Sequence, residues 1–384
     1  MPEMQPKQLL KSAKGNREQM LAELRSLVEI ESPSDDREAV NRAVDWVEEK
    51  AREMGPSAST RRHKQAKFGD HLEVRLGKPG GKAAVLLLGH LDTVWPMGTL
   101  ARMPFKIEKK RVWGPGVLDM KSGVVMALEA VRMLEMTGGV DREVILLLVS
   151  DEEVGSESSR PLTEEIAQRC GAVLVLEPGQ GLGGAAKTWR KGVGEYIVRI
   201  HGLASHSGVD FKRGQSAVIE LAHQVLKIAD FTDLKRGLTV NPGVIRGGTR
   251  SNVIAAYAEC QVDVRIQQLA DGARIEGKMR SLKPKNRHCR VEVEGGLNRP
   301  PMERTKGGLK LYAEARKIAD ELGFALKEEG TGGGSDGNFT AALGIPTLDG
   351  LGGVGEGAHA VHESILLEEL PRRTALLAGL IQRV

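Results

Sequence analysis

Hydrophobic residues form three short continuous runs in the first half of the chain, at 83–88, 144–149 and 172–176. Aliphatic runs without polar alternation predict strands that are buried on both faces of a sheet. Apolar positions at helical spacing over Lys7–Ile30 predict one helix, and a long apolar stretch over Gly123–Met136 predicts another. This alternation of strands and helices predicts an α/β domain with a layered mixed sheet and helices on both faces.

A different pattern begins after residue 188. Residues 251–266 alternate between apolar and polar, which is typical of a half-buried antiparallel strand. With three further strands and two helices they form a β-α-β-β-α-β order, which predicts a small ferredoxin-like α+β domain. These strands are 196–201, 238–246 and 290–294, and the helices are 215–229 and 272–282. We therefore expect an α/β domain in two parts, 1–188 and 300–384, with a second domain inserted at 189–299.

The composition narrows the function classes. The net charge of +4 comes from 55 basic and 51 acidic residues that are dispersed along the chain, so no basic tract predicts nucleic-acid binding. Cys170, Cys260 and Cys289 form no CxxC pair, which argues against a disulfide framework and a thiolate zinc site. Residues 1–25 lack the apolar core of a signal peptide, and no apolar run reaches membrane-spanning length. We therefore expect a cytoplasmic enzyme without a membrane partner.

Polar residues follow each of the three apolar runs. His90 and Asp92 follow the first, Glu152 and Glu153 the second, and Glu177 the third. Because chemistry in open α/β sheets collects at the carboxyl ends of strands, we expect these side chains to lie together. Residues i and i+2 of an extended segment point the same way, so Asp92 can orient His90 from behind. A lone histidine at a strand end is more often structural, but three such strand ends favour a metal site.

The adjacent carboxylates of Glu152 and Glu153 also favour a metal site. Two close carboxylates raise at least one pKa unless a cation neutralises them. One can then bind a metal while the other acts as a general base for water, whereas a solvated acidic loop is the alternative. With Asp119 and His359 added, the ligands are imidazoles and carboxylates without thiolates. This set suits zinc or a similar divalent ion and leaves cobalt and manganese open.

These residues lie in motifs that strongly resemble the co-catalytic zinc metallopeptidase family of glutamate carboxypeptidase, aminoacylase, acetylornithine deacetylase and succinyl-diaminopimelate desuccinylase. The motifs occur in the family's order over nearly the whole chain, at 90–94, 114–123, 151–156, 202–208, 331–336 and 359–363. The chain is most similar to the glutamate carboxypeptidase branch. Glutamate at position 177 resembles the carboxypeptidase and aminoacylase branches, because dipeptidase and aminopeptidase relatives often have aspartate there.

The resemblance implies two zinc ions that are bridged by Asp119 and a shared water. His90 and Glu177 would complete the protein ligands of one ion, and Glu153 and His359 those of the other.

The resemblance also implies roles around these ligands. Glu152 would be the general base and acid, and Asp92 the carboxylate behind the first ligand histidine. His362 is an alternative to His359, which we prefer because it precedes a glutamate by four positions. A cis peptide bond is expected after the bridging aspartate, between Asp119 and Met120.

The inserted domain resembles the family's lid and dimerisation domain, which implies a homodimer. His206 would reach into the partner's active site and help to hold the oxyanion, unless it only caps its own loop. Asn252 matches a substrate-contacting asparagine. Arg299 matches an arginine that grips the substrate's C-terminal carboxylate, for which a guanidinium fork is suited. Arg265 is either a second such residue or an exposed sheet charge, and the loop at Gly333 would let the backbone approach the substrate.

We therefore predict a dizinc metallohydrolase that releases a C-terminal amino acid from peptides or N-acyl amino acids. A biosynthetic deacylase of the acetylornithine or succinyl-diaminopimelate type is the alternative within enzymes. A non-catalytic metal-containing binding or scaffold protein is the alternative outside them. The presence of Glu152 and of every ligand argues against that last reading.

Overall fold

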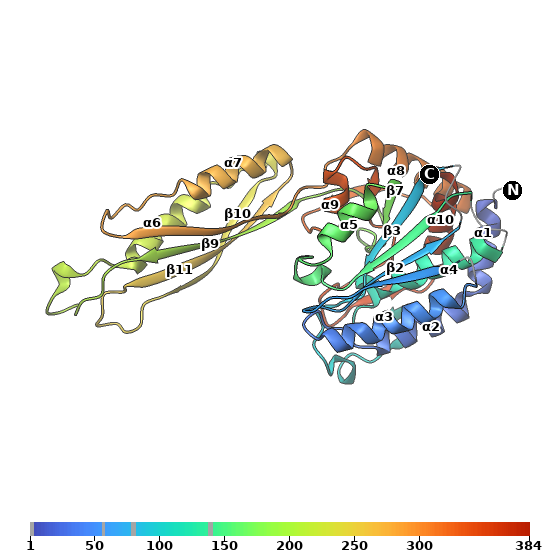
Figure 1. Ribbon diagram of the computed structural model, residues 1–384, viewed down its shortest axis with the longest axis horizontal. Coiled ribbons are helices and arrows are strands. Elements are labelled where there is room, and N and C mark those ends of the chain that lie inside the picture. Colours follow the sequence, from blue (N-terminus) through green and yellow to red (C-terminus); the bar gives the residue numbers. More distant parts are fainter. Residues whose placement is uncertain (1–3, 56–57, 78–81, 137–140) are drawn as a thin grey trace. The chain divides into compact units, whose positions relative to one another are not determined.

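The computed structural model describes residues 4–55, 58–77, 82–136 and 141–384 (Figure 1). The chain forms two compact units. Unit 1 comprises the residues up to Trp189 with Arg304–Thr331 and Ser335–Val384, and unit 2 comprises Arg190–Glu303 with Gly332–Gly334. The sequence placed the insertion at 189–299. The structure instead begins unit 2 at Arg190, continues it to Glu303 and adds the three loop glycines.

A six-stranded mixed sheet organises unit 1, in the order β1-β2-β6-β3-β7-β14. Strands β6, β3, β7 and β14 run parallel, whereas β2 pairs antiparallel with both β1 and β6. The strands are β1 (Ser59–His63), β2 (His71–Leu76), β3 (Ala84–His90), β6 (Val144–Val149), β7 (Cys170–Val175) and β14 (Thr347–Leu348). The three apolar runs of the sequence are therefore three neighbouring parallel strands, which confirms the predicted α/β class.

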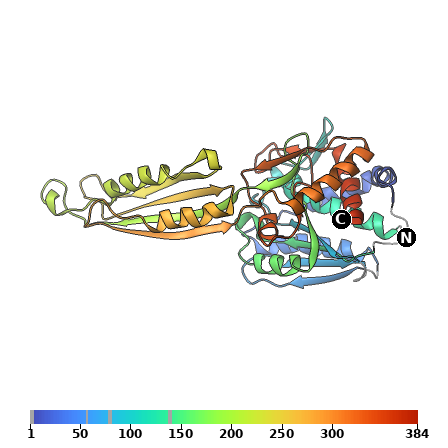
Figure 2. The same cartoon turned by 90° about the horizontal axis from the view of Figure 1, so that it is seen from above.

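Helices cover both faces of this sheet, as the two views in Figures 1 and 2 show. Leu87 and Leu146 belong to the large core shared with α1, α2, α3, α4, α8 and α10, while Leu86 and Leu147 face the core shared with α5. Burial on both faces explains why these strands are apolar throughout. The helices of unit 1 are α1 (Pro6–Gly15), α2 (Arg17–Glu29), α3 (Arg37–Arg52), α4 (Ser122–Met136), α5 (Arg160–Ala167), α8 (Lys306–Leu322), α9 (Gly337–Ala342) and α10 (Glu369–Arg383).

One predicted helix is in fact two. The sequence predicts a single helix over Lys7–Ile30, but the chain breaks at Asn16 between α1 and α2. The side-chain nitrogen Nδ2 of Asn16 donates to Oε1 of Glu129 in α4 at 2.6 Å. The apolar spacing continues through the break because both helices bury residues in the same core, so the pattern alone does not reveal it.

Two smaller sheets complete unit 1. The first has the order β15-β16-β5-β4, and the second pairs β13 with β8. Their strands are β4 (Lys106–Glu108), β5 (Arg111–Trp113), β8 (Ala186–Arg190), β13 (Glu328–Thr331), β15 (Gly355–Glu356) and β16 (Ser364–Leu366).

Unit 2 is the predicted β-α-β-β-α-β arrangement. Its antiparallel sheet has the order β10-β11-β9-β12, and α6 and α7 pack on it through one apolar core. The elements are β9 (Gly192–His201), α6 (Ala217–Ala229), β10 (Thr239–Gly247), β11 (Tyr257–Ile266), α7 (Leu269–Arg280) and β12 (Arg290–Arg299). Within the described parts of both units, none of the helices combines the length and the apolarity needed to cross a membrane.

Candidate metal centre

The carboxyl ends of β6, β3 and β7 carry the central residues of the site. His90 is the last residue of β3, Glu152 and Glu153 lie in the short turn η3 (Glu152–Val154) after β6, and Glu177 lies two residues after β7. Because β3 is flanked by β6 and β7 in parallel register, these ends meet at one edge of the sheet. This is the placement that the sequence pattern predicts.

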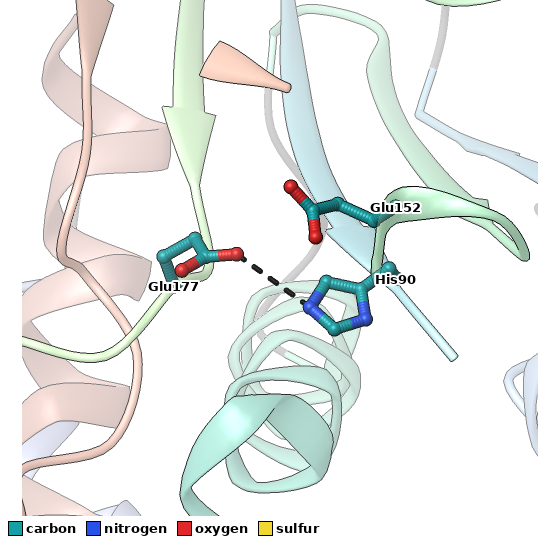
Figure 3. Close-up of side chains that lie close together, drawn as sticks. All are labelled: His90, Glu152 and Glu177. Carbon is teal, nitrogen blue, oxygen red and sulfur yellow. Dashed lines mark ion pairs between the residues drawn. The ribbon is translucent and has the colours of Figure 1, made fainter. Parts of the chain in front are cut away.

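Asp119 lies between two histidines and offers one oxygen to each. Its Oδ1 is 3.2 Å from Nε2 of His90, and its Oδ2 is 3.3 Å from Nε2 of His359. The same nitrogen of His90 is 3.5 Å from Oε1 of Glu177 (Figure 3). Nε2 of His359 is 3.3 Å from Oε2 of Glu153. Two imidazole–carboxylate pairs therefore share one central aspartate, and all five residues belong to unit 1.

Glu152 approaches this cluster from η3. Figure 3 shows its carboxylate beside the ring of His90 and facing Glu177. One ligand atom from each of these three residues lies within 4.8 Å of the others, and His90, Asp119 and Glu153 form a second group of the same kind. Glu152 is therefore close enough either to bind an ion or to exchange a proton with a molecule held there.

Asp119 comes from an irregular helical turn, η2 (Val117–Lys121), that precedes α4. The peptide bond between Asp119 and Met120 is cis, as the family resemblance implies. His359 has a backbone φ of +61°, which is uncommon for a residue with a side chain and clusters at functional sites. Of the two candidate histidines, the structure places His359 beside Asp119 and Glu153. His362 is exposed, and no ion pair joins it to these carboxylates within the described part of the chain.

The fully buried carboxylate of Asp92 has a broader role than the sequence suggested. The nearest oxygen to Nδ1 of His90 is the backbone carbonyl of Asp92 at 2.9 Å, while the carboxylate Oδ1 is 3.5 Å away. That carboxylate accepts the backbone N–H groups of Glu152 at 3.3 Å and Glu153 at 3.1 Å. It also accepts from Oγ of Ser34 at 2.7 Å. Asp92 thus fixes both the histidine and the turn that carries the two glutamates.

Close packing holds the segment that ends in Glu177. A Cβ atom at Gly123 or at Gly352 would collide with the carbonyl oxygen of Leu176, which directly precedes Glu177. Two glycines from distant parts of the chain therefore allow the start of α4 and the loop before β15 to pass close to this strand end.

The electrostatics of the cluster favour a bound cation. Burial lowers the pKa of His90, but hydrogen bonds with Asp119, Asp92 and Glu177 outweigh it and raise that pKa well above its usual value. Hydrogen bonds with Asp119 and Glu153 raise the pKa of His359 to about 10. These carboxylates thus draw positive charge into a buried site, a role that a divalent ion performs directly.

The donor set fits a metal ion. It consists of imidazole nitrogens and carboxylate oxygens, which suit zinc and similar divalent ions. Burial raises the pKa of Glu153, and its buried Oε1 has no hydrogen-bond partner among the described residues. A buried carboxylate oxygen without a partner is costly unless it binds a cation. These observations indicate a site that can hold a divalent ion.

His206 and Asn252 are brought together within unit 2. Both are exposed, and they lie on neighbouring loops that pair at His206 and Val253. The backbone N–H of Ser207 donates to the carbonyl oxygen of Asn252 at 3.0 Å. Nδ1 of His206 accepts from the backbone N–H of Gly208 at 3.1 Å, so the ring also caps its own loop.

The arginines predicted to bind substrate gather around the glycine loop of unit 2. The buried side chain of Arg299 packs so closely on Gly334 that a Cβ atom there would lie 2.9 Å from its Cδ. Nη1 of Arg265 donates to the carbonyl oxygen of Gly332 at 3.5 Å, and its other nitrogens pair with Asp263.

Sequence reasoning missed the buried Arg190 in this group. Its Nη1 donates to the carbonyl oxygens of Gly333 at 3.3 Å and Gly334 at 3.1 Å. It follows Trp189 near the expected boundary, and no motif around it marks its role.

An α/β unit interrupted in the sequence by an α+β unit, with imidazole and carboxylate side chains gathered at the strand ends, is the arrangement expected of a metal-dependent hydrolase. The chain belongs to the peptidase family M20/M25/M40, whose family model matches residues 86–383. This membership confirms the family predicted from the motifs.

Individual relatives agree with this assignment. The chain is 31% identical to carboxypeptidase G2 of Pseudomonas sp. (strain RS-16) over 381 residues, or 97% of this chain and 91% of that protein. It is also 31% identical to acetylornithine deacetylase of Klebsiella pneumoniae (strain 342), but over only 48% of this chain and 51% of that protein. A solved dinuclear metal-binding peptidase of Bacillus subtilis shares the fold, with a TM-score of 0.68, 15% identity and coverage of 96% of this chain and 98% of that one.

Proposed function

We propose that this protein is a dizinc carboxypeptidase-type amidohydrolase that releases a C-terminal amino acid, glutamate above all, from peptides or N-acyl amino acids. The observation that carries the proposal is the position of Asp119 between His90 and His359, with one oxygen toward each. A full-length relative named carboxypeptidase G2 supports the carboxypeptidase branch. The cytoplasmic location stays a prediction from the sequence.

The ligands divide into two sets that share Asp119. His90 and Glu177 would complete one set, and Glu153 and His359 the other, in keeping with the distances between these side chains. When bound, two divalent ions supply Lewis acidity, which polarises a scissile carbonyl and makes water easier to deprotonate. Zinc suits these ligands, and cobalt or manganese would fit the same donors.

Glu152 would move the proton in this reaction. Its carboxylate lies beside His90 and Glu177, where it can take a proton from the attacking water and pass it to the leaving amine. Asp92 contributes indirectly, because its carboxylate holds the backbone of Glu152 in place. His206, Asn252, Arg299, Arg265 and Gly333 of unit 2 would contact the substrate.

A homodimer formed through unit 2 is part of the same proposal. Strand β10 is an edge strand, and α6 exposes Ile219 and Leu226 by 61% and 69%. An unpaired strand edge beside exposed apolar side chains favours association with a second copy. Light scattering on the full chain would give twice the mass of one chain, and a monomer would contradict this part.

A hydrolysis screen tests the reaction. The panel contains N-acyl amino acids, peptides with varied C-terminal residues, benzoyl-glutamates, acetylornithine and succinyl-diaminopimelate. We expect zinc-loaded protein to release a free amino acid, with glutamate preferred, and chelator-treated protein to release none until metal is restored. Selective hydrolysis of acetylornithine would instead support the deacylase alternative. The similarity to acetylornithine deacetylase over about half of each chain is the observation that favours this alternative. Two bound ions without turnover on any substrate would support a binding protein.

Replacement of Arg299 by alanine is expected to raise KM about tenfold or more for substrates with a free α-carboxylate. The reason is the loss of a bidentate, charge-assisted contact with that carboxylate. A tenfold change in affinity corresponds to about 1.4 kcal/mol of binding free energy. Arg299→Lys keeps the charge without the fork and should recover only part of the loss. Arg290→Ala, in an exposed residue of the same strand, is the control. An equal loss on carboxylate-blocked analogues would contradict the proposed contact.

A further inference from the structure

The carboxylate of Glu363 is buried against the turn that contains Asp119, and it is not among the candidate ligands. Its side chain is 1% exposed, and its two oxygens accept four N–H groups. Oε1 accepts from the backbone of Leu118 at 2.9 Å and Asp119 at 3.0 Å. Oε2 accepts from the backbone of Gly116 at 2.9 Å and from Nε1 of Trp95 at 2.8 Å. A carboxylate has about four acceptor positions, so this one is fully used.

These contacts join two ligand-bearing segments that are distant in the sequence. Glu363 follows the ligand histidine His359 by four residues and holds the turn that contains Asp119, 244 positions away. Hydrogen bonds from N–H groups to a carboxylate are charge-assisted and stronger than neutral ones, and burial protects them from water. The Glu363 side chain therefore links the turn of the shared aspartate to the loop of one of its two histidines, beside the pairing of β16 with β5.

The two histidines differ in how much else holds them. His90 ends a central strand of the sheet, and its side chain is 1% exposed. His359 lies in a loop, and its side chain is 50% exposed. Within that loop the backbone N–H of Ala360 donates to the carbonyl oxygen of Gly357 at 2.8 Å, and that of Glu363 donates to the carbonyl oxygen of Ala360 at 2.9 Å. The carbonyl oxygen of Glu363 also accepts from the backbone N–H of Gly114 at 3.5 Å. The His359 side of the centre thus depends more on Glu363 than the His90 side does.

We propose that Glu363 is a positioning residue that holds the His359 side of the metal centre, so that its loss weakens the ion at His359 and Glu153 far more than the ion at His90 and Glu177. The inference rests on the two-ion centre proposed above. Glutamine at this position would place an NH₂ group against two N–H donors, which leaves buried donors unpaired and loosens the loop of His359 from the Asp119 turn.

Metal binding to the stripped full-length protein, followed by calorimetry and by metal content after dialysis, tests the inference. We expect two zinc equivalents per chain for the natural sequence. Glu363→Gln should retain one tight equivalent and bind the second about 10–100-fold more weakly, the usual cost of losing a residue that supports a ligand. Trp95→Phe removes one of the four hydrogen bonds and should weaken the second equivalent less.

Glu356→Gln is the matched control, because Glu356 lies in the same part of the chain but is half-exposed and paired with Arg111. It should bind both equivalents normally. Two equivalents of unchanged affinity in Glu363→Gln would overturn the inference, and so would an equal weakening of both ions. If Glu363→Gln does not fold, Trp95→Phe is measured in its place. Unchanged affinity for both equivalents, or an equal weakening of both, would then overturn the inference. Fewer than two equivalents in the natural protein would instead contradict the two-ion centre itself.

Discussion

Replacement of Glu152 by glutamine is expected to reduce kcat by about 10²–10⁴-fold while both metal equivalents remain bound. Glutamine has nearly the same shape but cannot take a proton from water at neutral pH. The backbone N–H of residue 152 would still donate to Asp92, so the turn should keep its position. The measurements are kcat on the preferred substrate and metal content after dialysis.

This variant distinguishes two possible roles of Glu152, as a metal ligand or as a general base. Glu152 lies within ligand distance of His90 and Glu177, so it is a candidate ligand as well as a candidate base. A ligand role predicts loss of metal together with activity, whereas a base role predicts loss of activity alone. Glu157→Gln is the control, because Glu157 lies just after the same turn but is exposed and paired with Lys67. Unchanged kcat in Glu152→Gln would remove Glu152 from the reaction.

Much of the fold is readable from the sequence because burial imposes patterns. Strands β3, β6 and β7 are buried on both faces and appear as continuous aliphatic runs, whereas β11 is covered on one face and alternates. The parallel order then places His90, Glu152 and Glu177 at one edge by topology alone. The break at Asn16 could not be predicted in this way. The helices on both sides of it share one core, so the helical spacing of apolar residues continues across the break.

The supporting contacts of the site are not readable in the same way. The hydrogen bonds that the Asp92 carboxylate accepts from the glutamate turn and from Ser34 join positions about 60 residues apart. The four bonds of Glu363 and those of Arg190 to the glycine loop arise only when distant segments fold together. Sequence motifs mark the residues that touch an ion, because their chemistry is distinctive, but they do not mark the buried groups that hold those residues in place.

The second large effect is expected at Asp119. Asp119→Asn should remove both metal equivalents under conditions where His359→Gln and Glu177→Gln each remove one. The physical reason is that, among the described residues, Asp119 alone offers an oxygen to each histidine, whereas the other candidate ligands belong to one side. An amide has one neutral oxygen and a nitrogen that does not bind zinc, so at most one side can keep a weakened contact. The loss should exceed the roughly 10–100-fold that follows removal of a supporting residue.

Metal content of the three variants, measured in parallel, distinguishes a shared ligand from an ordinary one. Asp45→Asn, in an exposed aspartate of α3, is the control for an Asp-to-Asn change and should retain both ions. If Asp119→Asn keeps one tight ion, Asp119 belongs to one side only, and the two-ion centre would have to be bridged by another group. If all three variants lose both ions together, the two sides bind as one cooperative unit, since the shared aspartate would then transmit the loss of either partner to the other.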